Sequence, residues 1–171
     1  MPCPFTTIGN AIIAEIRTAR DASDLQFNEF EAECLWSKRE LELTELDVLR
    51  VDVAPLHWTQ SLRSRGSWSR LCHYQIGVRK RFSPEHRDAQ TGFVLNADVE
   101  KLITMAADVL GLFMPVRPNH QGRALTDVAG AVWREPKEGS TRIMIDWDLL
   151  RESHQFCAWF PLTYEFAEAS A

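Results

Sequence analysis

The chain has 171 residues, of which 45% are hydrophobic and 10% aromatic, so it can bury the core of one domain over residues 1–171. It has no run of eighteen apolar residues, and its start, MPCPFTTIGN, lacks the basic and apolar regions of a signal peptide. These features argue against a membrane protein, a secreted protein and a disordered chain, and they predict a domain that is made and kept in a cytoplasm.

The formal net charge of -5 hides a separation of charge along the chain. Residues 1–57 hold 11 acids and 5 bases, residues 58–87 hold 1 acid and 7 bases, and residues 88–171 hold 12 acids and 7 bases. A concentrated basic block in an acidic chain favours nucleic acid or an acidic protein surface as partner, including a second copy of the chain. The alternative is a solvated basic loop without a partner.

The chain begins with a predicted helix and an acidic strand. Isoleucines recur at helical spacing over residues 8–22, which predicts an amphipathic helix. Apolar and acidic residues then alternate over residues 30–36, as is typical of a strand. We expect this strand to present an acidic outer face with Glu29, Glu31 and Glu33.

A second strand and a basic loop come next. Leu49, Val51 and Val53 alternate with charged residues up to Pro55, which predicts a strand that ends there. The following stretch, residues 56–70, shows no clear period and is predicted to be a basic loop. Its basic residues are Arg63, Arg65 and Arg70.

The stretch from Trp68 to Phe82 is the longest that alternates as a single β-strand. Its even positions are mostly apolar and its odd positions mostly polar, so one face is expected to pack on a core. The odd positions include Arg79 and Arg81, so the other face is expected to be cationic and to face water or a partner. The strand should end at Pro84, which has no N–H to donate.

A second helix and an irregular region follow the central strand. Asn96 is expected to cap a helix whose apolar face runs to Leu110. Residues 114–142 are rich in turn-forming residues and are predicted to be irregular, with short strands near 128–134 and 142–146.

Residues 156–166 alternate again and predict a last strand. Pro161 lies inside it and cannot donate to a ladder, which predicts an edge position or a bulge. The expected core joins this strand to the central strand and to the two helices. Its predicted members are Ile12, Tyr74, Ile76, Val78, Leu102, Ile103, Phe160 and Leu162.

Cysteine and histidine residues raise the question of a metal site. The four cysteines are Cys3, Cys34, Cys72 and Cys157, and their wide spacing does not indicate disulfides. His154 with Cys157, and Cys72 with His73, are residue types that bind zinc. In a strand the two members of each pair point to opposite faces, so we expect packed cysteines and surface histidines instead.

Asp146 and Asp148 lie near a strand end, where two carboxylates can hold Mg²⁺ for a nuclease. Because Leu149 and Leu150 follow directly, either aspartate can instead cap a turn of helix. No Walker loop, dinucleotide fingerprint or nucleophile motif occurs, so we predict no cofactor, no catalytic residue and no enzymatic activity. A metal-dependent nuclease is the third hypothesis for the function.

Trp58, Trp68 and Tyr74 lie among arginines, and basic surfaces with aromatic residues bind single-stranded nucleic acid by stacking. Aromatic residues at alternate strand positions are more often part of a core, and no DNA-reading or RNA-reading motif occurs. A nucleic-acid-binding module that uses the basic segment 58–87 is the second hypothesis.

The order of the elements resembles that of the tail terminator proteins of long-tailed bacteriophages and prophages. The resemblance spans nearly the whole chain and includes V-x-V-x-P, Y-x-I-x-V-x-K-R and a final D-x-x-L-x-E-x-x-Q-F…L-T-Y, although the spacing around the glutamate departs slightly. The matching residues are Val51, Val53, Pro55, Tyr74 to Arg81, Asp146, Leu149, Arg151, Gln155, Phe156, Leu162, Thr163 and Tyr164.

This resemblance implies an α+β fold, with a mostly antiparallel sheet of four to five strands and two main helices packed against it. It also implies a virion protein that forms a homo-hexameric ring, caps the tail tube, ends tube polymerisation and offers a docking surface to the head-tail connector. Such a ring lies at the head-proximal end of the tail, assembles in the host cytoplasm, and lets DNA pass through its lumen without sequence-specific contact.

A cyclic ring is built from heterologous interfaces, in which one patch meets a different patch on the neighbour. The separated charges predict that the basic block meets acidic residues of the next copy. The predicted interface residues are Arg63, Arg65, Arg70, Arg79, Arg81, Glu29, Glu31 and Glu33.

Overall fold

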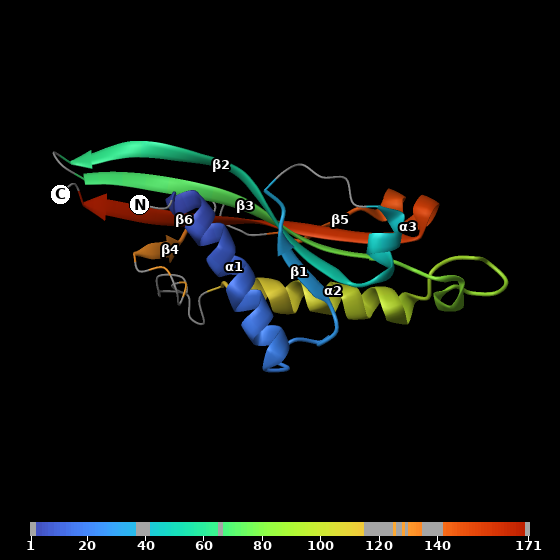
Figure 1. Ribbon diagram of the computed structural model, residues 1–171. Helices are drawn as coiled ribbons and strands as arrows, with labels where there is room; N and C mark the ends of the chain where they lie inside the picture. The colour runs from blue at the N-terminus through green and yellow to red at the C-terminus, as the bar shows by residue number, and fades with distance from the viewer. Residues whose placement is uncertain are drawn as a thin grey trace.

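The computed structural model describes residues 3–36, 42–64, 67–114, 125, 128, 130–134 and 142–169. It is elongated, and the helices α1 and α2 cover one face of a long sheet while α3 lies at one end (Figure 1). The helices are α1 (Pro4–Asp21), α2 (Asn96–Gly111) and α3 (Trp147–Ser153), with 3₁₀ turns η1 (Leu43–Asp47) and η2 (Pro84–His86). The strands are β1 (Glu31–Cys34), β2 (Arg50–Ser64), β3 (Ser67–Arg81), β4 (Ala131–Trp133), β5 (Met144–Ile145) and β6 (Gln155–Ala169).

The sheet has the order β1-β2-β3-β6-β4, and β5 also pairs with β6. Only β1 and β2 run parallel among these pairs, and the other pairs are antiparallel. The predicted α+β fold is therefore confirmed, with six strands rather than four to five. The two short edge strands β4 and β5 account for the difference. No helix in the described part of the chain is long and apolar enough to cross a membrane.

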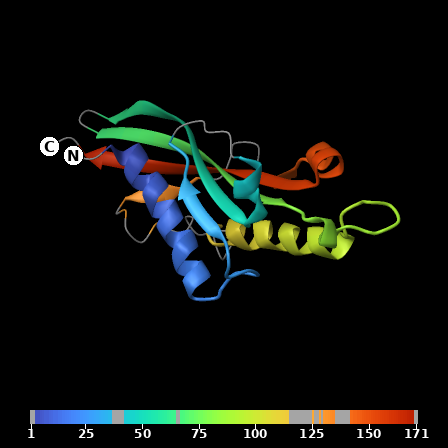
Figure 2. The ribbon, with the colours of Figure 1, turned by 45° about the vertical axis from the view of Figure 1, so that its right-hand side comes forward.

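The core lies between the sheet and the helices α1 and α2 (Figure 2). Tyr74, Ile76 and Val78 of β3 are fully buried there, and their antiparallel partners in β6 are buried as well. Seven of the eight predicted core residues are buried, and Ile103 is half-buried and packs against the core. The strict alternation of β3 and β6 thus separates a helix-covered face from an outer face, as predicted.

The predicted basic loop over residues 56–70 is wrong, because β2 continues through Pro55 to Ser64 and pairs with β3 along its length. The carbonyl of Val53 accepts a hydrogen bond from Leu35 on the β1 side. The backbone nitrogen of Pro55, two residues later, faces the same side of β2. The pairing of β1 with β2 has ended before this residue. Its missing N–H therefore costs no ladder bond, and a bulge follows between Pro55 and His57.

The two main helices differ from the prediction at their starts. α1 begins at Pro4, ahead of the predicted residue 8, because proline suits the first turn of a helix. Within α1, Gly9 lies against Trp36, and a Cβ there would come within 2.8 Å of the indole. Asn96 is the first residue of α2 rather than its cap, since Leu95 holds the cap position without a side-chain bond.

Pro161 lies in β6 opposite Gln75. The carbonyl of Thr163 accepts from Arg134, next to β4, and the carbonyl of Cys157 accepts from Asp146, next to β5. The backbone N–H and C=O groups of alternate residues of a strand point to the same neighbouring strand. The backbone nitrogen of Pro161 therefore faces the gap between β4 and β5. The predicted local edge is thus confirmed, as are the short strands themselves. The predicted irregular region 114–142 lies largely outside the described residues.

Candidate interaction surfaces

The predicted basic residues divide between the two faces of the sheet. Arg79 and Arg81 occupy odd positions of β3 on the outer face, whereas Arg70 occupies an even position on the helix-covered face. Arg65 and the side chain of Arg63 lie outside the described residues. The five arginines therefore do not form a single cationic surface, because strand alternation separates them.

The acidic strand already has basic partners within the same chain. Arg50 donates to Glu31 at 2.7 Å and to Glu33 at 2.6 Å, across the parallel pair β1 and β2. Asp52 lies next to this group, with Arg79 Nε 3.3 Å and Arg50 Nε 3.8 Å from its carboxylate oxygens. The sequence predicts contacts between the basic residues of one copy and the acidic residues of the next. In the structure, Glu31, Glu33 and Asp52 instead contact arginines of their own chain on the outer face of the sheet.

Asp52 is the most buried charged residue of this network, with only 1% of its surface exposed. Burial raises the pKa of its carboxyl, Arg79 and Arg50 lower it, and Glu33 raises it.

The other two predicted residues, Arg81 and Glu29, lie outside this network. Arg81 lies 3.8 Å from Asp47 of η1, and Glu29 is exposed beside Lys80 and Lys101 at a separate cavity. Arg50 and Asp52 were not among the predicted site residues, because a parallel register leaves no local signal in the sequence.

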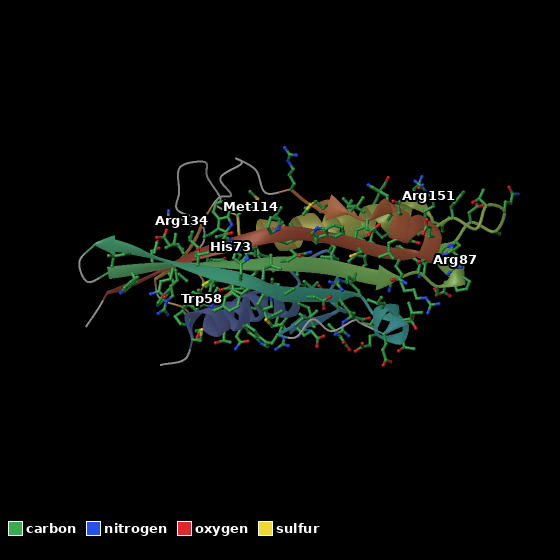
Figure 3. All side chains as sticks on the ribbon, turned by 90° about the horizontal axis from the view of Figure 1, so that it is seen from above. Trp58, His73, Arg87, Met114, Arg134 and Arg151 are labelled. Carbon is green, nitrogen blue, oxygen red and sulfur yellow. The ribbon has the colours of Figure 1, made fainter. Side chains whose placement is uncertain are left out.

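A second polar group lies farther along the outer face. The rings of His57 and His73 stack with centroids 4.3 Å apart, and His73 Nδ1 lies 3.0 Å from the hydroxyl of Thr163. Burial and the neighbouring His57 lower the pKa of His73. Beside them Glu165 accepts from Ser69 and from Arg134, and Figure 3 shows His73 and Arg134 from above.

The outer half of the β2–β3 hairpin, residues 56–64 and 67–73, extends beyond α1, and we call it the arm (Figure 1). On the helix-covered side of the sheet the arm exposes Trp58 by 47%, Leu62 by 61% and Trp68 by 41%. Leu62 and Trp68 are direct cross-strand partners near the tip. The guanidinium of Arg70 lies 5.8 Å from the ring centre of Trp58, in a cation–π contact.

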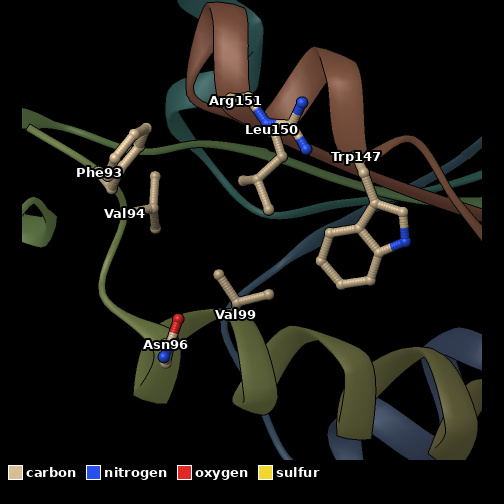
Figure 4. A pocket seen from close by; sticks show the side chains of 7 residues that line it. All are labelled: Phe93, Val94, Asn96, Val99, Trp147, Leu150 and Arg151. Atoms are coloured by element: carbon tan, nitrogen blue, oxygen red, sulfur yellow. The ribbon is translucent and has the colours of Figure 1, made fainter.

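The opposite end of the molecule holds an apolar pocket of about 220 Å³, which we call the end pocket (Figure 4). It lies between the start of α2, the segment before it and α3, and its lining residues are Phe93, Val94, Asn96, Val99, Trp147, Leu150 and Arg151. Phe93 is 59% exposed and Trp147 is 51% exposed. His154 Nε2 lies 3.2 Å from the carbonyl of Gly92 and joins the two walls.

Asp146 caps α3, because its carboxylate accepts a hydrogen bond of 2.8 Å from the backbone N–H of Leu149. The capping interpretation of this aspartate is confirmed. Asp148 points to solvent and lies 3.8 Å from Arg151. Among the described residues no group of three or more histidine, cysteine or acidic side chains is placed to hold a metal ion, and the four cysteines are free thiols.

The chain matches no protein-family model and no curated protein sequence.

Proposed function

We propose that this chain is a structural subunit that assembles into a ring, in the manner of a phage tail terminator. The observation that carries the proposal is the exposure of large apolar side chains at both ends of an elongated subunit, on the arm and at the end pocket. Contiguous exposed apolar surface marks sites of protein association. Two different patches on one subunit suit the heterologous contacts that close a ring.

In this proposal six copies form the ring at the head-proximal end of the tail, after assembly in the host cytoplasm. One ring face binds the tail tube protein and ends its polymerisation, and the other receives the head-tail connector. DNA passes through the lumen without sequence-specific contact, and the subunit performs no catalytic step. The α+β fold expected from the resemblance to tail terminators supports this assignment.

Native mass spectrometry of the purified chain, alone and with tail tube protein, tests the proposal. We expect a closed species of six times the monomer mass of 19.6 kDa, and electron microscopy should show tubes that stop growing at a ring. A chain that stays monomeric at every concentration, and that leaves tube growth unchanged, contradicts the proposal.

The second candidate is a nucleic-acid-binding module, and the contact between Arg70 and Trp58 is the observation that favours it. Exposed aromatic rings beside arginine are the elements of a stacking surface for single strands. Binding of this kind weakens with salt, by roughly 0.7 log units per log of salt for each phosphate neutralised on a single strand. Fluorescence anisotropy with single-stranded DNA at several salt concentrations distinguishes the two candidates. Tight, steeply salt-dependent binding by a monomer favours the module.

A further inference from the structure

The arm presents apolar side chains that the described part of the chain leaves exposed. Leu62 and Trp68 face each other across β2 and β3 near the tip, on the side that α1 and α2 cover farther along. Both side chains are exposed, although they lie on the same face of the sheet as the buried Cys72. Contact between apolar side chains and water raises the free energy of the subunit. A partner that buries these side chains lowers it.

The end pocket has a size that suits such side chains. An apolar cavity of about 150 Å³ is large enough to hold benzene, so the 220 Å³ of the end pocket have room for a side chain of the arm. Its exposed walls are Phe93 on the segment before α2 and Trp147 on α3 (Figure 4). Aromatic side chains that line a pocket are typical anchors of protein interfaces.

The segments of the chain that form the two surfaces differ in the sign of their net charge. Residues 56–73 hold three arginines and no acid, whereas residues 84–100 hold four acids and one arginine. α3, which forms the other wall of the end pocket, holds two acids, Asp148 and Glu152, and one base, Arg151, of which Arg151 lines the pocket itself. Complementary charge of this kind steers two surfaces toward each other and disfavours the contact of two arms.

The arm cannot reach the end pocket of its own chain. β3 has 15 residues and at about 3.3 Å per residue spans roughly 50 Å between the arm and the segment that leads to Phe93. Figure 3 places Trp58 toward one end, and Arg87 and Arg151 at the other. The two surfaces can therefore meet only between different copies, in a head-to-tail contact that closes a ring or continues as a filament.

We propose that the arm of each subunit docks in the end pocket of the next, with Trp68 as the anchor between Phe93 and Trp147 and Leu62 beside it. This inference rests on the proposed ring and specifies the two surfaces that form it. The partner of both surfaces is a second copy of this chain.

Two charged variants separate the two halves of the contact. Trp68→Glu disables the arm and keeps the end pocket, whereas Trp147→Glu disables the end pocket and keeps the arm. Both positions are exposed, so each variant should fold, which circular dichroism checks. Leu43→Glu places the same charge on an exposed apolar position of η1 and is the matched control.

Native mass spectrometry should show rings for the wild type and for Leu43→Glu, and monomers for each of the two variants alone. An equal mixture of the two variants should form dimers and nothing larger, because each member then offers one intact surface. Rings formed by both variants, or by Trp147→Glu alone, overturn the docking and leave the ring proposal in place. A monomeric wild type overturns the proposed function itself. Unchanged rings with loss of single-stranded DNA binding in Trp68→Glu assign the arm to nucleic acid and overturn the docking.

Discussion

Arg50 and Glu33 lie on two parallel neighbouring strands and are joined by a hydrogen bond of 2.6 Å. The same guanidinium binds Glu31 and lies beside the buried carboxylate of Asp52. Arg50 thus adds charged hydrogen bonds to the ladder bonds that hold the four-residue strand β1 on β2.

Replacement of Arg50 by alanine should destabilise the protein by about 3 kcal/mol, because it leaves Asp52 buried with one basic neighbour fewer. Arg151→Ala is the control, since this arginine is exposed in its pair with Asp148 and should contribute less than about 1 kcal/mol. Urea unfolding measures both free energies. Equal losses in the two variants contradict the structural role of Arg50.

Ile76 lies at the centre of β3 and is completely buried. Ile76→Ala should cost roughly 2 to 5 kcal/mol, the range for a truncated buried aliphatic side chain. Leu43→Ala, at an exposed position of η1, should change the free energy of unfolding by less than about 0.5 kcal/mol. A loss below that limit at Ile76 would show that the two faces of β3 are assigned in reverse.

The stacked pair of His57 and His73 should make the stability of the protein depend on pH. Burial and His57 lower the pKa of His73, so the folded protein holds the neutral ring more strongly than the unfolded chain does. The stability that this provides is present above the usual histidine pKa of about 6.5 and is lost as the pH falls through the lowered value. NMR titration should give His73 a pKa below that of a free histidine.

His57→Gln removes one of the two causes of this shift, so the pKa of His73 should move upward while part of the depression from burial remains. The stability lost on acidification below pH 6.5 should shrink accordingly. A His73 pKa that is unchanged in the variant assigns the shift to burial alone and contradicts the role of the stacked neighbour.

Asp146→Ala should destabilise the protein by about 1 kcal/mol through loss of the helix cap at α3, whereas Asp146→Asn keeps an acceptor and should cost less. Asp148→Ala, at the next exposed acidic position, should stay within about 0.5 kcal/mol. Thermal unfolding compares the three variants. Cleavage of plasmid DNA with Mg²⁺ that the wild type performs and both Asp146→Asn and Asp148→Asn lack would instead support the nuclease hypothesis.

Period-two alternation was sufficient to predict β3, β6 and the core between them. Tyr74, Ile76 and Phe160 face helices on one side, so the contrast between apolar and polar positions is strong. Both main helices follow from the same contrast between buried and exposed residues, whereas the α+β class was what the resemblance to tail terminators implied.

The sequence predicts a loop for the β2 part of the arm, residues 56–64, because neither face is fully buried there and the contrast between alternate residues fades. Trp58 and Leu62 alternate with Thr59 and Ser61, yet Gln60 interrupts the apolar row. The charge network was missed for a different reason. Glu31 meets Arg50 through a parallel register, which depends on the path of the chain between them and not on any local spacing.

The pairing of β3 with β6 also determines the order in which the molecule can be built. β2 and β3 adjoin in the chain and can pair early, but the other side of β3 waits for residues 155–169, which a ribosome delivers much later. Until then Tyr74, Ile76 and Val78 lack their cross-strand neighbours in β6, and one side of β3 remains an unpaired edge. Until residues 155–169 are made, pairing of the open edge of β3 with another strand competes with correct folding.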